Sequence, residues 1–208
     1  MHPYKNEGLN VIYNLLFCDD INLYKENNIE PGSYPWSILF NPDADKKELE
    51  KISTDPSLET RQRLLACHLL KTKGIKENNK ELSGVIIEVG LDDGLDVLAA
   101  FEDGTARYIN HAETMIVWET QTKESDEIIK RLFEISKNVV RQIGPWEKER
   151  KQPPVNGMVR LSFLVSGEIY FGEGPFDVLA KDQMGGPVIN AGIELMKFLI
   201  DQAEKKKN

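Results

Sequence analysis

The residues best suited to chemistry are polar side chains at two expected turns between residues 84 and 119. They are Asp92, Asp93, Asp96, Asn110 and His111. A histidine close to two carboxylates is the arrangement that a metal site or an acid–base site requires. The same side chains also bond turn backbones without any ligand. The sequence favours the turn interpretation and keeps a metal-dependent site at these turns as its alternative.

Three turn signals, at residues 92–94, 102–104 and 110–113, divide residues 84–119 into four short segments that alternate apolar and polar side chains. Asp-Gly between such segments is a strong hairpin signal, so we expect an antiparallel β-meander. Its second strand is apolar on both faces and should be central, whereas Arg107 and Tyr108 predict a wetter third strand. Alternate turns lie at the same end of a meander, so Asp92 and Asp93 should approach His111 while Asp103 lies opposite.

Paired glycines suggest a second kind of site. Gly185-Gly186 precedes Pro187 and the last helix, and glycine lets a backbone close around an anion at a helix start. The pair matches neither the dinucleotide nor the Walker pattern. Ordinary helix entry explains it, and binding of a small carboxylate or phosphate by Gly185 and Gly186 stays open.

A charged, proline-ended stretch, residues 146–154, is the best candidate for a linker or a long exposed connection. Trp146 begins it. An exposed tryptophan is a common interface anchor, and the alternative is that this ring folds back over the preceding long helix.

Helical spacing of apolar residues predicts helices over residues 8–18, 45–52, 57–73, 124–143 and 188–204. Asp55 is expected to cap the third of these, with Pro56 at its first position. Residues 36–40 are predicted to be extended and residues 75–82 to form a polar loop. Residues 176–180 are predicted as a further strand, and their likeness to residues 95–99 leaves an internal duplication open.

Together these elements predict an α+β fold. A helical region, residues 1–80, is followed by the meander and a long amphipathic helix, residues 81–145, and by a second hairpin–helix unit, residues 155–208. Whether the two sheet regions merge is left open.

The composition limits the class of partner. The chain has 208 residues and a formal net charge of −8, which repels nucleic acid and anionic lipid. It shows no leader and no membrane span, and its two cysteines, Cys18 and Cys67, read as reduced and buried. We therefore expect a cytoplasmic protein without a cofactor.

No stretch of the chain meets the spacing rules of a catalytic, metal or cofactor motif. The favoured hypothesis is a non-catalytic binding or regulatory module, of the adaptor or toxin-neutralising type, that captures a basic protein partner through an acidic surface. The alternative is a small metal-dependent hydrolase or transferase with its site at the meander turns. The sequence gives no oligomeric state.

Overall fold

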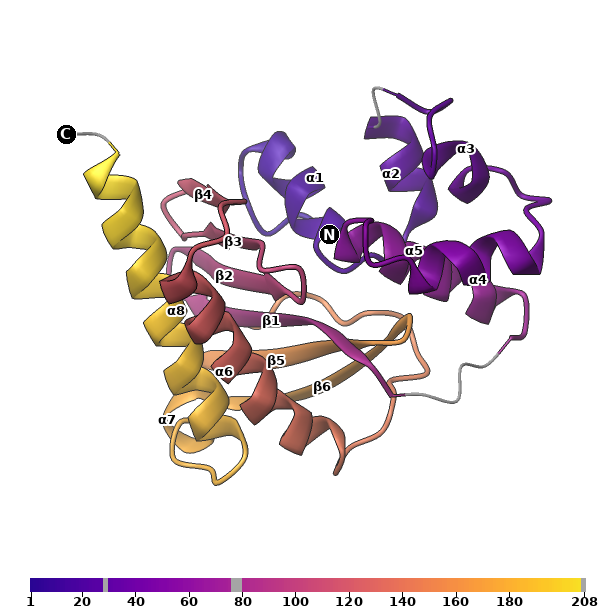
Figure 1. Cartoon of the computed structure of the whole chain (residues 1–208). Helices are drawn as coiled ribbons and strands as arrows, with labels where there is room; N and C mark the ends of the chain where they lie inside the picture. Colours follow the sequence, from indigo (N-terminus) through magenta and orange to yellow (C-terminus); the bar gives the residue numbers. More distant parts are fainter. Residues whose placement is uncertain (28–29, 76–79, 207–208) are drawn as a thin grey trace.

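The computed structural model describes residues 1–27, 30–75 and 80–206, and it has the α+β architecture that the sequence predicts (Figure 1). The helices are α1 (Glu7–Leu15), α2 (Ile21–Asn27), α3 (Trp36–Leu39), α4 (Lys46–Thr54), α5 (Thr60–Thr72), α6 (Lys123–Val140), α7 (Phe176–Leu179) and α8 (Gly185–Lys205). The strands are β1 (Leu82–Leu91), β2 (Gly94–Phe101), β3 (Ala106–Ile109), β4 (Met115–Trp118), β5 (Met158–Val165) and β6 (Glu168–Pro175).

All six of these strands form one antiparallel sheet with the order β4-β3-β2-β1-β5-β6. The β1–β4 meander is confirmed. The late hairpin joins it because β5 pairs along nearly the whole of β1, from Leu82 opposite Val165 to Val89 opposite Val159. The two sheet regions therefore merge.

Helices cover the sheet on both faces (Figure 1). Val85 and Ile87 of β1 pack in the core with α6 and α8, whereas Ile86 lies in a second core with α1, α4 and α5. This follows from the two-residue period of a strand, which sends alternate side chains to opposite faces. Strand β2 is buried on both faces, as expected. Within the described residues, no helix is long and apolar enough to cross a bilayer.

The third strand, β3, is more buried than its sequence predicts. Arg107 and Tyr108 are both buried, with 6% and 7% of their surface exposed. Strand β3 lies between β2 and β4, and the Arg107 guanidinium donates to the carbonyl oxygens of Ala106 and Trp118. The expectation of a wet strand was wrong because these polar ends find partners inside the sheet.

Three local predictions are also wrong. Residues 36–39 and 176–179 are the short helices α3 and α7, so the stretch that resembles β2 in sequence is helical and lends no support to a duplication. Helix α5 begins at Thr60, and Asp55 instead ends α4. Of the expected loop over residues 75–82, residues 76–79 lie outside the described residues and Leu82 already begins β1.

Candidate functional site

A row of charged side chains crosses the sheet on the face that carries α1 to α5. Glu88 of β1 lies directly opposite Arg160 of β5, and Arg160 lies opposite Glu173 of β6. Glu88 is fully buried, and 3% of Arg160 is exposed. The Arg160 Nε donates to Glu173 Oε2 at 2.6 Å, and its Nη1 lies 3.6 Å from Glu88 Oε2. The arginine is therefore held between two carboxylates from the neighbouring strands.

Helix α1 completes this row from above. Tyr13 is fully buried, and its hydroxyl donates to Glu88 Oε1 at 2.7 Å. Burial raises the pKa of the Glu88 carboxyl, and the nearby Arg160 guanidinium acts in the opposite direction. Burial and the charge of Glu88 raise the pKa of the Tyr13 phenol, so this hydroxyl stays a donor. The contact fixes α1 against the middle of the sheet.

The stretch expected as a linker is docked on this same face. Trp146 N donates to the Ile169 carbonyl of β6 at 2.8 Å. Arg160 donates from Nη1 and Nη2 to the carbonyl oxygens of Lys151 and Gln152. Residues 146–152, named the strap here, are therefore tied to both β5 and β6, although several of their side chains are exposed.

Arg150 ties the strap to the N-terminal helices. Its guanidinium carbon lies 3.9 Å from the centre of the Phe17 ring, and Nη2 donates to Asn14 Oδ1 at 2.8 Å. Its Nε is 3.2 Å from Asp19 Oδ2. Its Nη1 is buried and has no hydrogen-bond partner among the described residues. Arg150 thus keeps an unused donor beside the strap.

A cavity of about 310 Å³ lies between the strap, α5 and the β5–β6 hairpin. Its aromatic wall is formed by Trp146 and Phe171, whose ring centres are 5.0 Å apart with an angle of 64° between the planes. Five lysines and arginines line it against three acids. His68 and Ser162 also line the cavity. The charged lining residues are Lys71, Lys148, Arg150, Lys151, Arg160, Asp19, Glu149 and Glu168.

The residues that line the cavity include more basic than acidic side chains, whereas the chain as a whole carries a net charge of −8. Guanidinium and ammonium groups form short, strong hydrogen bonds with carboxylate and phosphate oxygens. Aromatic faces accept flat or apolar groups. The cavity is therefore suited to an anionic group that is carried beside an apolar surface.

The sequence-predicted residues lie at another place, at the turn end of the meander. His111 lies against Gly94 in the β1–β2 turn, as expected. Its carboxylate partner is Asp96: His111 Nδ1 and backbone N donate to Asp96 Oδ1 at 2.8 and 2.7 Å, and Tyr108 donates to Oδ2 at 2.8 Å. The hydrogen bond to Asp96 raises the pKa of the His111 imidazole.

The other residues of that group have turn contacts. Asp92 accepts a hydrogen bond from Asn156, Asn110 Oδ1 accepts from Thr114 N at 2.8 Å, and Asp93 is exposed. Across the described part of the chain, no three His, Cys, Asp or Glu side chains are placed to hold a metal ion. The hydrogen bonds of Asp92 and Asn110 are contacts of the kind that the turn interpretation predicts, and the metal-dependent alternative stays a hypothesis.

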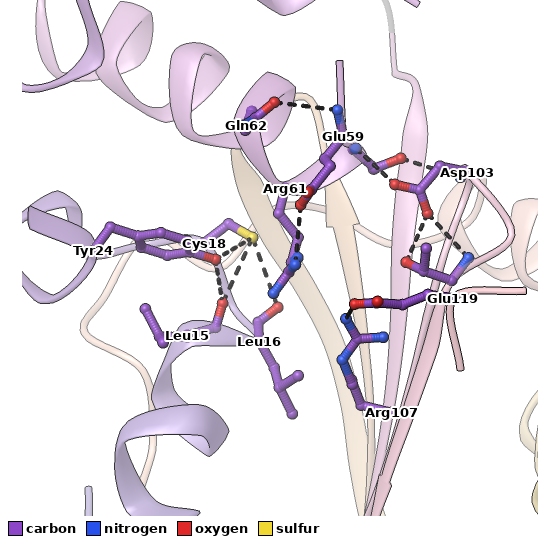
Figure 2. Close-up of polar contacts among 12 residues, drawn as sticks. Leu15, Leu16, Cys18, Tyr24, Glu59, Arg61, Gln62, Asp103, Arg107 and Glu119 are labelled. Atoms are coloured by element: carbon purple, nitrogen blue, oxygen red, sulfur yellow. Dashed lines mark hydrogen bonds and ion pairs between the residues drawn. The ribbon is translucent and has the colours of Figure 1, made fainter. Parts of the chain in front are cut away.

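Asp103 lies between β2 and β3, at the opposite end of the meander from His111, as expected. Figure 2 shows it near two ion pairs, Arg61–Glu59 and Arg107–Glu119. Its carboxylate accepts hydrogen bonds from Thr60 N and from Thr105. Nearby, Arg107 pairs with Glu119, and burial raises the pKa of the Cys18 thiol to about 12. Both cysteines are buried, and a protonated thiol such as that of Cys18 is a poor nucleophile.

The paired glycines have a packing role. Asp182 Oδ1 already accepts hydrogen bonds from Met184 N and Gly185 N, and the Asp182 carbonyl accepts from Gly186 N. A Cβ on Gly186 would lie 2.6 Å from the Ala180 carbonyl oxygen. The amides proposed for an anion are therefore occupied, and glycine is needed where α8 meets α7.

Sequence reasoning placed Trp146 at a binding surface or over the long helix, and the structure places it on Phe171 of β6. It missed Glu88, Arg150 and Arg160. A signal was present for two of them, because Glu88 and Arg160 are the only charged residues in β1 and β5, whose other side chains are mostly apolar. Charged residues in such positions are rare unless they are paired.

Comparison of the chain with protein-family models, curated proteins and solved structures finds no match.

Proposed function

We propose that this protein is a non-catalytic binding module whose ligand enters the cavity between the strap, α5 and the β5–β6 hairpin. One observation carries the proposal: beside the aromatic wall of the cavity lies Lys148, which makes no ion pair with another described residue, in a chain with a net charge of −8. Such a cavity attracts an anionic group that the rest of the surface repels. This differs from the capture of a basic partner by an acidic surface, which remains the expectation from composition alone.

The contacts around the cavity support binding more than catalysis. Activated serine nucleophiles are hydrogen-bonded to a general base. Ser162 and His68 both line the cavity, and among the described residues no hydrogen bond joins them. Arg160 is held by carboxylates and strap carbonyls. These contacts fix the strap against β5, so the cavity wall is preorganised, which lowers the entropic cost of binding.

The test is retention of a ligand by the full chain. Purified protein is incubated with an extract of its native host, desalted and examined by native mass spectrometry. We expect a bound anion that is released with unchanged mass. The variant His68→Trp, which places an indole at the cavity wall, should lose it. The matched control is His2→Trp, because His2 is exposed and lies outside the cavity.

Two results would overturn the proposal. Retention of the same compound by His68→Trp would put its site elsewhere, provided that circular dichroism shows a folded variant. Release of a chemically altered compound by the wild-type protein would indicate an enzyme.

A further inference from the structure

Resting on the proposed function, we infer that the cavity takes a small organic anion in which a carboxylate or phosphate is joined to a planar ring. The anionic group would bind Lys148 and Arg150 of the strap, and the ring would lie against Trp146 and Phe171.

The lysines and arginines that line the cavity differ in whether they are already ion-paired. Arg160 and Lys151 are paired with Glu173, Lys71 is paired with Glu168, and the Nε of Arg150 is paired with Asp19. Lys148 makes no ion pair with another described residue and lies 5.6 Å above the Trp146 ring. Arg150 Nη1 is buried without a hydrogen-bond partner in the described part of the chain. These two groups are therefore the donors left for an oxyanion.

Two of the lysines that line the cavity lie over the indole ring of Trp146. Lys148 and Lys151 lie 5.6 and 5.7 Å from the centre of the Trp146 ring, at cation–π distance. An oxyanion attracts ammonium groups more strongly than an aromatic face does. Binding of the anion would therefore draw Lys148 away from the indole and open the ring on that side, while Lys151 stays paired with Glu173 near the Trp146 and Phe171 rings. The two halves of such a ligand would favour each other's binding.

Size limits the ligand further. The cavity volume of about 310 Å³ lies at the lower end of the range for small-molecule sites, about 300–1,000 Å³. A single ring system with one anionic group fits this space, whereas a polymer would have to extend beyond it. The two sources of this chemistry are a nucleoside monophosphate and an aromatic carboxylic acid.

The experiment titrates the full chain with four probes by calorimetry: adenosine monophosphate, indole-3-acetate, inorganic phosphate and adenosine. We expect one of the two ring-bearing anions to bind at least about tenfold more tightly than phosphate or adenosine, since each of these supplies one half of the contacts. The better ring-bearing anion identifies the source. The tryptophan fluorescence of the protein should change on binding, and this change should be absent in Trp146→Phe.

Lys148→Gln is the test variant because Lys148 is exposed and the substitution should not affect folding. We expect it to weaken the ring-bearing anion about tenfold and to leave adenosine unaffected. Lys47→Gln is the control, since Lys47 is equally exposed and lies on α4 away from the cavity.

The inference would be overturned if neither ring-bearing anion bound more tightly than adenosine, or if Lys148→Gln had no effect on the better of the two. So would phosphate binding as tightly as the ring-bearing anions, since the site would then recognise the anion alone. If a host compound is retained and lost in His68→Trp while all four probes fail, the inference falls and the proposed function stands. If neither a host compound nor a probe binds, both fall.

Discussion

At the scale of single residues, the Asp96 carboxylate shows how a turn residue comes to resemble a catalytic one. It accepts hydrogen bonds from Tyr108 and from both the backbone and the ring of His111. A carboxylate that orients an imidazole is also part of a catalytic triad. Here the acceptor closes the β3–β4 turn onto β2, and the imidazole is 40% exposed. The contact therefore stabilises the meander.

This pair predicts a pH-dependent contribution to stability. The hydrogen bond to Asp96 raises the pKa of His111 above its ordinary value near 6.5. The stabilisation is thus fully present below about pH 6.5 and is lost as the pH rises through the folded-state pKa. Urea unfolding of wild type and His111→Gln should differ more at about pH 5.5 than at about pH 9, by less than about 1 kcal/mol because the pair is solvent-exposed.

Asp96→Asn provides the control, since it removes the charge that favours the imidazolium. The difference between His111→Gln and its parent should then lose most of its pH dependence. A difference that grows as the pH rises would contradict the assigned role of the pair.

The hairpin register was readable from the sequence because Asp-Gly turns fix it locally. That placed His111 correctly beside the first turn. The identity of its partner was not readable in the same way. Asp96 was grouped with Asp92 and Asp93, yet only Asp96 lies on β2 with its side chain toward the third turn. The difference is one of side-chain direction, which depends on the strand's exact register.

At the scale of elements, helix α5 begins where a distant turn supplies its cap. Thr60 N donates to Asp103 Oδ2 at 2.8 Å, and Asp103 N donates to Thr60 Oγ1 at 3.1 Å. The free N–H groups of a helix start need acceptors, and here the acceptor is not local. Asp55 and Pro56 have the residue types of a helix start, but Asp55 bonds Ser57 instead. This explains the misplaced start in the sequence prediction.

The reciprocal bond predicts that Asp103→Ala destabilises the fold by about 1–3 kcal/mol, because it leaves the Thr60 amide without its acceptor in a half-buried place. Equilibrium urea unfolding near neutral pH measures this. Asp93→Ala is the matched control, an exposed turn aspartate that should change stability by less than about 0.5 kcal/mol. Equal effects of the two substitutions would show that the link between α5 and β2–β3 contributes little.

Short apolar elements were the least predictable. The stretch from Phe176 to Ala180 reads much like the β2 stretch from Leu95 to Ala99, yet only the latter is a strand. Pro175 precedes α7 and Asp182 follows it, bonding the start of α8. A few apolar residues cannot distinguish strand from helix by periodicity alone, so tertiary surroundings decide.

At the scale of the whole molecule, the sheet separates two cores, and the charged row lies in the layer that meets α1. The sequence predicted the local meander and both long helices, because each follows a local period. It could not predict the cavity, which is assembled from α5, the β5–β6 hairpin, the strap and the residues after α1. Such a site depends on the pairing of β1 with β5, which no local pattern specifies.

The last prediction concerns Glu88, which connects the two layers through Tyr13 above it and Arg160 beside it. Glu88→Ala should destabilise the protein by about 3–5 kcal/mol, because it leaves a buried guanidinium and a buried hydroxyl without this partner. Glu88→Gln should cost less. Glutamine keeps an acceptor for Tyr13. Burial already raises the pKa of the Glu88 carboxyl, which favours its neutral form, and an amide is neutral too. Chemical denaturation of both variants measures the difference.

Tyr13→Phe separates the two contacts. If Glu88 works as a bridge, the combined variant Tyr13→Phe with Glu88→Ala should be less destabilised than the sum of its parts, because the hydroxyl no longer lacks a partner. Additive effects would mean that Glu88 acts on Arg160 alone. Glu88→Ala and Glu88→Gln of equal stability would show that a hydrogen-bond acceptor at this position contributes nothing, and that α1 is held to the sheet by the aliphatic and aromatic packing around Tyr13.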